Sequence, residues 1–136
     1  MSDDTELLRE TQVFWDSNPC DGQTSYDNRC KFRYGKDPWL LSVLQELPAY
    51  TDILEVGCGQ GTDALTICSH KTSGRYTGLD LSAESVASAQ KAATELSEKG
   101  RLLTMPLFMQ GNAEKLPFED NSFDCILSVG VLTSYP

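Results

Sequence analysis

Hydrophobic and polar residues in the first part of this chain alternate with the periodicity of an amphipathic helix. Apolar side chains recur every three or four residues, the spacing that places them on one face of a helix. Residues 5–16 show it, and so does the segment 38–47, with apolar positions at Leu40, Val43, Leu44 and Leu47. Asp37 and Pro38 favour a helix start there, because aspartate caps helix N-termini and proline suits the first helical position. We predict helices in both segments, with an irregular connection through the polar residues 20–36.

Farther along the chain, short apolar runs alternate with helical segments. The apolar runs are four predicted strands, at residues 52–56, 75–79, 107–110 and 124–129. Helical periodicity fills residues 62–70, and Ser82 caps a second, longer helix. Strands that alternate with helices of crossover length favour a parallel sheet built from right-handed connections. We therefore predict an α/β domain over residues 51–136, preceded by a helical extension over residues 1–50.

Composition and charge exclude several classes of protein for this chain. The chain has 136 residues, enough for one hydrophobic core, and a net charge of −9 from 20 acidic and 11 basic side chains. This acidic surplus argues against nucleic acid as a partner, because phosphate binding requires a basic surface. No apolar run reaches the length of a membrane span, and the acidic N-terminus lacks the apolar core of a secretory signal. We expect a cytoplasmic protein that binds neither nucleic acid nor membrane.

The basic and sulfur-containing side chains give little evidence for a further functional site. Four basic residues form a cluster that is either a site for an anionic ligand or a solvated surface: Arg29, Lys31, Arg33 and Lys36. The five cysteines form no C-x-x-C pair, and His70 is the single histidine. The spacing of a four-ligand zinc site is therefore absent, and we predict no metal site and free thiols in a reducing compartment.

The stretch DILEVGCGQGTDAL, residues 52–65, carries the main chemical signal. A strand that runs into Gly57, Gly59 and Gly61 and then into a helix is typical of a nucleotide-binding turn, where glycine lets a ligand lie against the backbone. Pyrophosphate-binding turns prefer G-x-G-x-x-G, whereas this turn reads G-x-G-x-G and follows Glu55. A carboxylate at that position repels phosphate and favours a cation, such as the ammonium or sulfonium of S-adenosylmethionine.

A second carboxylate supports a nucleoside ligand. Asp80 ends the second predicted strand, 23 residues after Gly57 and close to the offset at which a carboxylate meets ribose hydroxyls. The alternative is that Asp80 caps the following helix. Ser82 can fill that role, so we favour the ribose interaction for Asp80.

On these residues the chain resembles the class I S-adenosylmethionine-dependent methyltransferases, particularly those that act on small molecules. LEVGCGQGTDAL resembles the first motif of the family and YTGLDLSAESVASAQ the second, while QGNAEKLPFEDNSFDCILSVGVLTSYP resembles the third and fourth motifs joined. The resemblance covers about residues 51–136. It implies a Rossmann-like sheet with strand order 3-2-1-4, flanked by helices, in which four of the seven family strands are present.

The resemblance also implies roles for individual residues. Glu55 would meet the amino group of the cofactor, and the turn with Gly57, Cys58, Gly59 and Gly61 would pack along its methionine and ribose portions. Asp80 would bind the ribose, and three positions would surround the adenine: Leu81, Asn112 and Ala113. Asn112 departs from the aspartate frequent in the family, and its alternative role is that of an ordinary turn residue. Ser128, at the end of the fourth strand, would lie near the reactive methyl group.

The predicted function is methyl transfer from S-adenosylmethionine to an unidentified small-molecule acceptor. The alternative is a non-catalytic fragment or regulatory module that binds the same cofactor, and Glu55 argues against a third option, a nicotinamide oxidoreductase. Substrate-contacting residues of the family mostly follow the fourth strand, so no catalytic residue is assigned. We expect the chain to be a fragment whose remainder, or another chain, pairs along the fourth strand. Trp15 and Tyr34 either fold over the cofactor or belong to the core.

Overall fold

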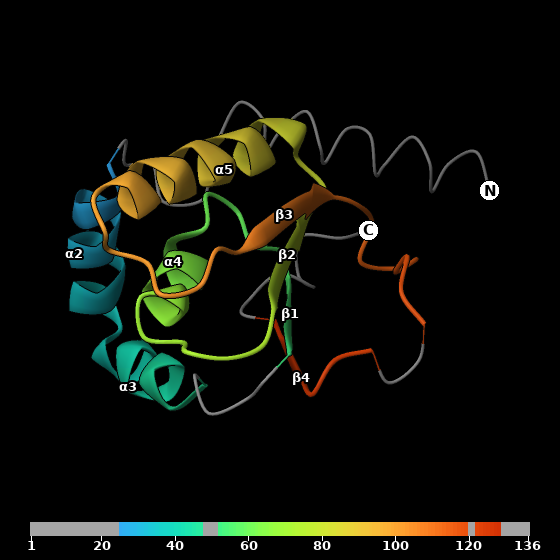
Figure 1. Cartoon of the computed structure of the whole chain (residues 1–136), viewed down its shortest axis with the longest axis horizontal. Helices are drawn as coiled ribbons and strands as arrows, with labels where there is room; N and C mark the ends of the chain where they lie inside the picture. The colour runs from blue at the N-terminus through green and yellow to red at the C-terminus, as the bar shows by residue number, and fades with distance from the viewer. Residues whose placement is uncertain (1–24, 48–51, 120–121, 129–136) are drawn as a thin grey trace.

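The chain folds around one four-stranded parallel sheet (Figure 1). The structure, a computed structural model, describes residues 25–47, 52–119 and 122–128, so the helix predicted at residues 5–16 lies outside the described residues. The strands are β1 (Ile53–Val56), β2 (Tyr76–Asp80), β3 (Leu107–Gln110) and β4 (Cys125–Leu127). Their order is β3-β2-β1-β4, which confirms the predicted topology.

The strand β1 lies inside the sheet, between β2 and β4. Its residue Glu55 is the register partner of Gly78 in β2 and of Leu127 in β4. All three pairings are parallel, so the carboxyl ends of the strands meet at one edge of the sheet. Ligands of open parallel sheets bind at that edge, where the strand order reverses direction.

Two helices provide the crossovers, as the sequence predicts. Helix α4 (Thr62–Cys68) links β1 to β2, and α5 (Ala83–Glu98) links β2 to β3. The Ser82 hydroxyl accepts a hydrogen bond of 3.1 Å from the Ser85 amide, which satisfies one of the free donors at the start of α5. The inward face of α5 carries the buried residues Ala89, Ala93 and Leu96.

The prediction of an irregular connection through residues 20–36 is wrong for its second half. Residues Tyr26–Lys36 form helix α2, whose N-cap Ser25 accepts a hydrogen bond of 3.2 Å from the Asn28 amide. The buried residues of α2 are Arg29 and Tyr34, which bear polar groups. Hydrophobic periodicity did not reveal this helix, because its inward face packs through hydrogen-bonding side chains.

The next helix, α3, spans Pro38–Glu46 and matches its prediction closely. Leu40 and Leu44 are buried as the periodicity indicates, whereas Val43 is exposed. Leu40 and Leu44 join the same hydrophobic core as residues of α4 and α5.

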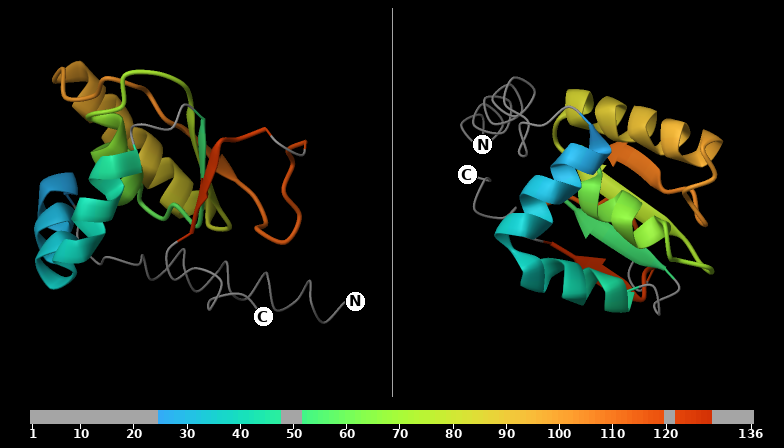
Figure 2. Two further views of the ribbon diagram at one scale, coloured as in Figure 1. Left: turned by 90° about the horizontal axis from the view of Figure 1, so that it is seen from below. Right: turned by 90° about the vertical axis from the view of Figure 1, so that its left-hand side faces the viewer.

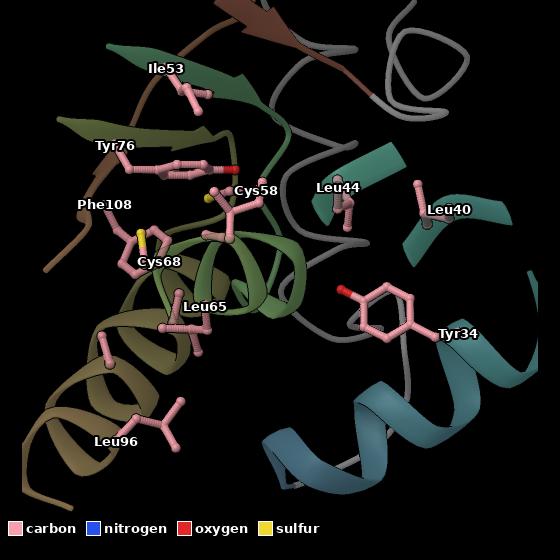
Figure 3. Close-up of a cluster of buried hydrophobic side chains, with 14 residues drawn as sticks. Tyr34, Leu40, Leu44, Ile53, Cys58, Leu65, Cys68, Tyr76, Leu96 and Phe108 are labelled. Carbon is pink, nitrogen blue, oxygen red and sulfur yellow. The ribbon is translucent and has the colours of Figure 1, made fainter. Parts of the chain in front are cut away.

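The helices of the described residues all pack on one face of the sheet (Figure 2). Figure 3 shows the core on that side, where the ring of Tyr76 lies between the sheet and α4. On the opposite face, three strand residues are covered by side chains of the connection between β3 and β4: Leu54, Val56 and Leu79 under Ala113, Phe118 and Phe123. Neighbouring positions on this second face remain open, with Ile126 62% and Leu107 57% exposed.

Candidate cofactor site

The glycine turn forms the base of the candidate site, directly after β1. Gly57, Gly59 and Gly61 all have positive φ angles, of 79°, 54° and 82°. A Cβ on Gly61 would lie 3.0 Å from both Ala89 and Phe108, so this glycine lets the turn pack against α5 and β3. A Cβ on Gly59 would meet no atom of the described residues within 4 Å. The turn therefore presents bare backbone with free space at Gly59.

Four backbone amides of the turn donate hydrogen bonds within the protein. The amides of Gly57 and Cys58 donate to the Leu79 carbonyl at 2.6 and 3.0 Å, and the Gly61 amide donates to the Cys58 carbonyl at 2.9 Å. The Gly59 amide donates to the Asp80 carboxylate at 2.8 Å. A phosphate-binding turn instead points free amides at its ligand. This pattern argues against a pyrophosphate ligand and fits a nucleoside without phosphates.

Asp80 is held rigidly at the end of β2. One carboxylate oxygen accepts from the Gly59 amide at 2.8 Å, and the other accepts from the Ser82 amide at 2.9 Å. Ser82 supplies the hydroxyl that caps α5, so the side chain of Asp80 links the turn to the start of that helix. A carboxylate oxygen can accept more than one hydrogen bond, so bonds to backbone amides are compatible with a ribose ligand.

Glu55 is buried on the same face of the sheet as α4, with 4% of its surface exposed. Its Oε1 accepts a hydrogen bond of 2.7 Å from the Tyr76 hydroxyl. Burial, followed by the nearby Asp63 carboxylate, raises the pKa of Glu55 to about 8, although the Tyr76 hydrogen bond and Arg33 act in the opposite direction. Glu55 is thus a carboxyl group whose charge is costly until a cation approaches it.

Side chains of helix α2 hydrogen-bond to the first residues of α4, directly after the glycine turn. The sequence analysis did not predict these contacts. Arg33 makes two hydrogen bonds of 2.8 Å to the Asp63 carboxylate in the first turn of α4, and the Tyr34 hydroxyl donates to the same group at 2.8 Å. Arg29 donates to the Thr62 hydroxyl at 3.0 Å. The signal was present in the basic cluster, because Arg29 and Arg33 are one helical turn apart. Both bind protein groups, while Lys31 and Lys36 of the cluster are exposed.

The other predicted residues lie around the same edge in different roles. The Cys58 side chain is in the core, where burial raises the pKa of its thiol well above the usual range. The Leu81 carbonyl accepts from the Gln110 side chain at 3.1 Å, and Ser128 is exposed just after β4. Asn112 accepts a hydrogen bond of 2.9 Å from the Glu114 amide and so forms a turn, beside Ala113 in the second-face cluster. The Asn112 oxygen keeps a second lone pair for a ligand.

A groove of about 420 Å³ lies between the start of α2 and helix α5. Its lining includes Arg29, Lys91 and Gln60 of the glycine turn, but neither Glu55 nor Asp80. The groove therefore borders the turn without including the two candidate carboxyl groups. Within the described residues we find no cluster of three metal-binding side chains and no helix of the length and apolarity that a membrane span requires.

A parallel sheet of order β3-β2-β1-β4, with a glycine turn after β1 and a carboxylate after β2, defines the class I S-adenosylmethionine-dependent methyltransferase fold. The comparison with family models agrees. The model described as "Methyltransferase domain" matches residues 54–136, and the chain belongs to this family.

Curated relatives cover the same region. Phthiotriol/phenolphthiotriol dimycocerosates methyltransferase of Mycobacterium tuberculosis (strain ATCC 25618 / H37Rv) is 42% identical over 86 residues, which are 62% of this chain and 28% of that protein. Fatty-acid O-methyltransferase of Mycolicibacterium smegmatis is 33% identical over 84 residues, again 62% of this chain and 28% of that protein. The chain therefore matches little more than a quarter of the length of these relatives.

Solved structures share the fold. Magnesium protoporphyrin IX methyltransferase from Synechocystis PCC 6803, crystallised with S-adenosylmethionine, aligns with a TM-score of 0.69 at 22% identity, over 96% of this chain and 64% of that one. The [4+2]-cyclase SpnF aligns with a TM-score of 0.57 at 28% identity, over 90% of this chain and 43% of that one.

Proposed function

We propose that this chain binds S-adenosylmethionine at the carboxyl edge of its sheet and is the cofactor-binding half of an enzyme that methylates a small molecule. The observation that carries the proposal is the glycine turn itself. Four of its amides donate hydrogen bonds within the protein, its free space lies at Gly59, and Asp80 is fixed beside it. That combination suits a nucleoside attached to a cationic tail.

The residues present fit the cofactor. Asp80 would accept from the ribose hydroxyls, and the bare backbone at Gly59 would allow the ligand to approach closely. Glu55 would take the α-ammonium group, which lowers the cost of its negative charge. Leu81, Asn112 and Ala113 would border the adenine, and Ser128 would lie toward the methyl group.

The chemistry follows from binding and orientation. S-adenosylmethionine, when bound, supplies a methyl group on a positively charged sulfur that a nucleophile can attack. The chain contributes a fixed position for each end of the ligand, and such alignment of reactants accounts for a large share of catalysis in transfer reactions. Transfer would break the bond between the methyl carbon and the sulfur, form a bond from that carbon to the acceptor atom and release S-adenosylhomocysteine; an acceptor atom that carries a proton would release it to solvent.

We propose a hydrophobic small molecule as the acceptor. The names of two relatives support this class, since one is a methyltransferase for dimycocerosates and the other for fatty acids. Residues 1–50 would form an N-terminal extension and residues 51–136 the cofactor-binding half, with further chain pairing along β4. We propose a reducing, cytoplasmic setting, in which the described cysteines Cys30, Cys58, Cys68 and Cys125 would remain thiols.

A second candidate function is cofactor binding without methyl transfer. The similarity to a protein described as a [4+2]-cyclase supports this candidate, because that protein has a similar fold and is not described as a methyltransferase. Transfer of a labelled methyl group from S-adenosylmethionine to a long-chain fatty acid would distinguish the two functions.

Titration calorimetry with S-adenosylhomocysteine tests the binding proposal directly. We expect saturable binding of one molecule per chain and far weaker binding of NAD, the matched control that carries a pyrophosphate. Preference for NAD, or no binding of S-adenosylhomocysteine, would contradict the proposal.

A further inference from the structure

Three carboxyl groups approach one another around the glycine turn. Glu55 is the penultimate residue of β1, Asp63 lies in the first turn of α4, and Asp80 ends β2. Glu55 and Asp63 are each only 4% exposed, so water screens their mutual repulsion poorly. The site therefore needs a compensating positive charge.

Arg33 supplies that charge from a different element. Two nitrogens of its guanidinium, Nε and Nη2, donate to the two oxygens of Asp63 at 2.8 Å, the paired geometry that makes arginine–carboxylate contacts strong and directional. The Tyr34 hydroxyl adds a third donor at 2.8 Å. Figure 3 shows Tyr34 extending from α2 with its hydroxyl directed away from its own helix. Asp63 is thus neutralised and held by two consecutive residues of α2.

We propose that Arg33 and Tyr34 are positioning residues for the cofactor site: by anchoring and neutralising Asp63, they leave Glu55 as the carboxylate that receives the cationic end of the cofactor. The inference rests on the proposed function of Glu55. It assigns to the N-terminal helix α2 a part in cofactor affinity, although α2 precedes the region that the family model matches.

The groups that face Glu55 come from every element packed around it. They are Asp63 of α4, Arg33 of α2, Tyr76 and Asp80 of β2, and the thiols of Cys58 and Cys68. Asp63 and Asp80 raise the pKa of Glu55, and Arg33 lowers it. Removing the arginine would remove a favourable charge and also release the negative charge of Asp63. Both changes favour protonated Glu55, which cannot pair with an ammonium group.

The experiment compares Arg33→Met with Arg33→Met/Asp63→Asn, which removes both charges of the pair. Two quantities are measured: the Glu55 titration midpoint, by NMR of carboxyl-labelled ligand-free chain, and the affinity for S-adenosylhomocysteine across pH. We expect Arg33→Met to raise the midpoint and to weaken binding at neutral pH by about tenfold, the effect of one pH unit. The double variant should return both quantities toward wild type.

The ion pair between Arg101 and Asp27, a residue of α2, provides a matched control. Arg101 bonds Asp27 of α2 at 2.8 Å, but both side chains are exposed and lie away from Glu55. Arg101→Met should leave the Glu55 midpoint and the affinity unchanged. Arg33→Lys, which keeps the charge but loses the paired geometry, should retain the midpoint and serves if Arg33→Met does not fold.

Three results would overturn the inference, and each has a different meaning. If wild type binds S-adenosylhomocysteine and Arg33→Met binds it equally at every pH, the positioning role alone is wrong. If wild type binds none, the proposed function fails and the positioning role with it. A fall in melting temperature without a change in the Glu55 midpoint would show that Arg33 is merely structural.

Discussion

At the scale of single residues, the two carboxyl groups of the candidate site, Asp80 and Glu55, have different surroundings. Asp80 has both oxygens hydrogen-bonded to backbone amides, which fix the orientation of its side chain beside the glycine turn. Glu55 is buried against Tyr76, and its pKa is raised to about 8. The sequence predicted both as ligand-binding carboxylates. It could not predict the burial of Glu55, which depends on Tyr76 and on α2, far away along the chain.

Asp80→Ala should weaken binding of S-adenosylhomocysteine by about 1–3 kcal/mol, because the ribose hydroxyls and the Gly59 amide lose their acceptor. Titration calorimetry measures the change. Asp52→Ala is the matched control, since Asp52 is bonded to the exposed Arg75. Equal affinity for wild type and Asp80→Ala would remove Asp80 from the site.

Glu55 should make folding stability depend on pH. The folded state holds the Glu55 proton up to about pH 8, whereas the ordinary pKa is 4.5. Between these values the folded chain binds more protons than the unfolded chain, so the free energy of unfolding falls as pH rises. Urea unfolding across this range should show a smaller decline for Glu55→Gln, accompanied by weaker cofactor binding. An identical slope in the variant would show that Glu55 does not carry the effect.

At the scale of elements, apolar periodicity predicted β1 to β4, α3, α4 and α5, because each buries hydrophobic side chains. It failed for α2, whose contacts with α4 are made by Arg29, Arg33 and Tyr34. A polar inward face leaves no hydrophobic stripe in the sequence. The glycine turn was predictable from its spacing, but the internal use of its amides required the packing of β1 beside β2.

Two glycines of the turn should respond differently to alanine. Gly61→Ala places a methyl group 3.0 Å from Ala89 and Phe108, so it should destabilise the fold by about 1–3 kcal/mol. Gly59→Ala meets open space, so its loss of stability should come from φ strain alone, about 1–2 kcal/mol, while cofactor binding is abolished. Thermal unfolding and calorimetry separate the two effects. Full cofactor binding by Gly59→Ala would contradict the assigned ligand position.

At the scale of the whole molecule, the described helices cover one face of the sheet and leave apolar positions open on the other. Ile126 in β4 and Leu107 in β3 are more than half exposed there. Apolar surface of this kind promotes association.

Replacing Ile126 by threonine should therefore reduce self-association of the isolated chain, since the exposed apolar surface is lost and a β-branched residue is kept. Sedimentation velocity at several concentrations measures the effect. Val43→Thr on the exposed side of α3 is the control and should change association little. Unchanged association in Ile126→Thr would show that the sheet face around Ile126 does not mediate self-association.

The polar contact between α2 and α4 has an evolutionary consequence. An apolar interface tolerates single substitutions, whereas Asp63 depends on Arg33, because Asp63 is only 4% exposed and would be a buried charge without the guanidinium group. Natural relatives should therefore exchange the two positions together, and lineages that lack the α2 helix should carry an uncharged residue where this chain has Asp63.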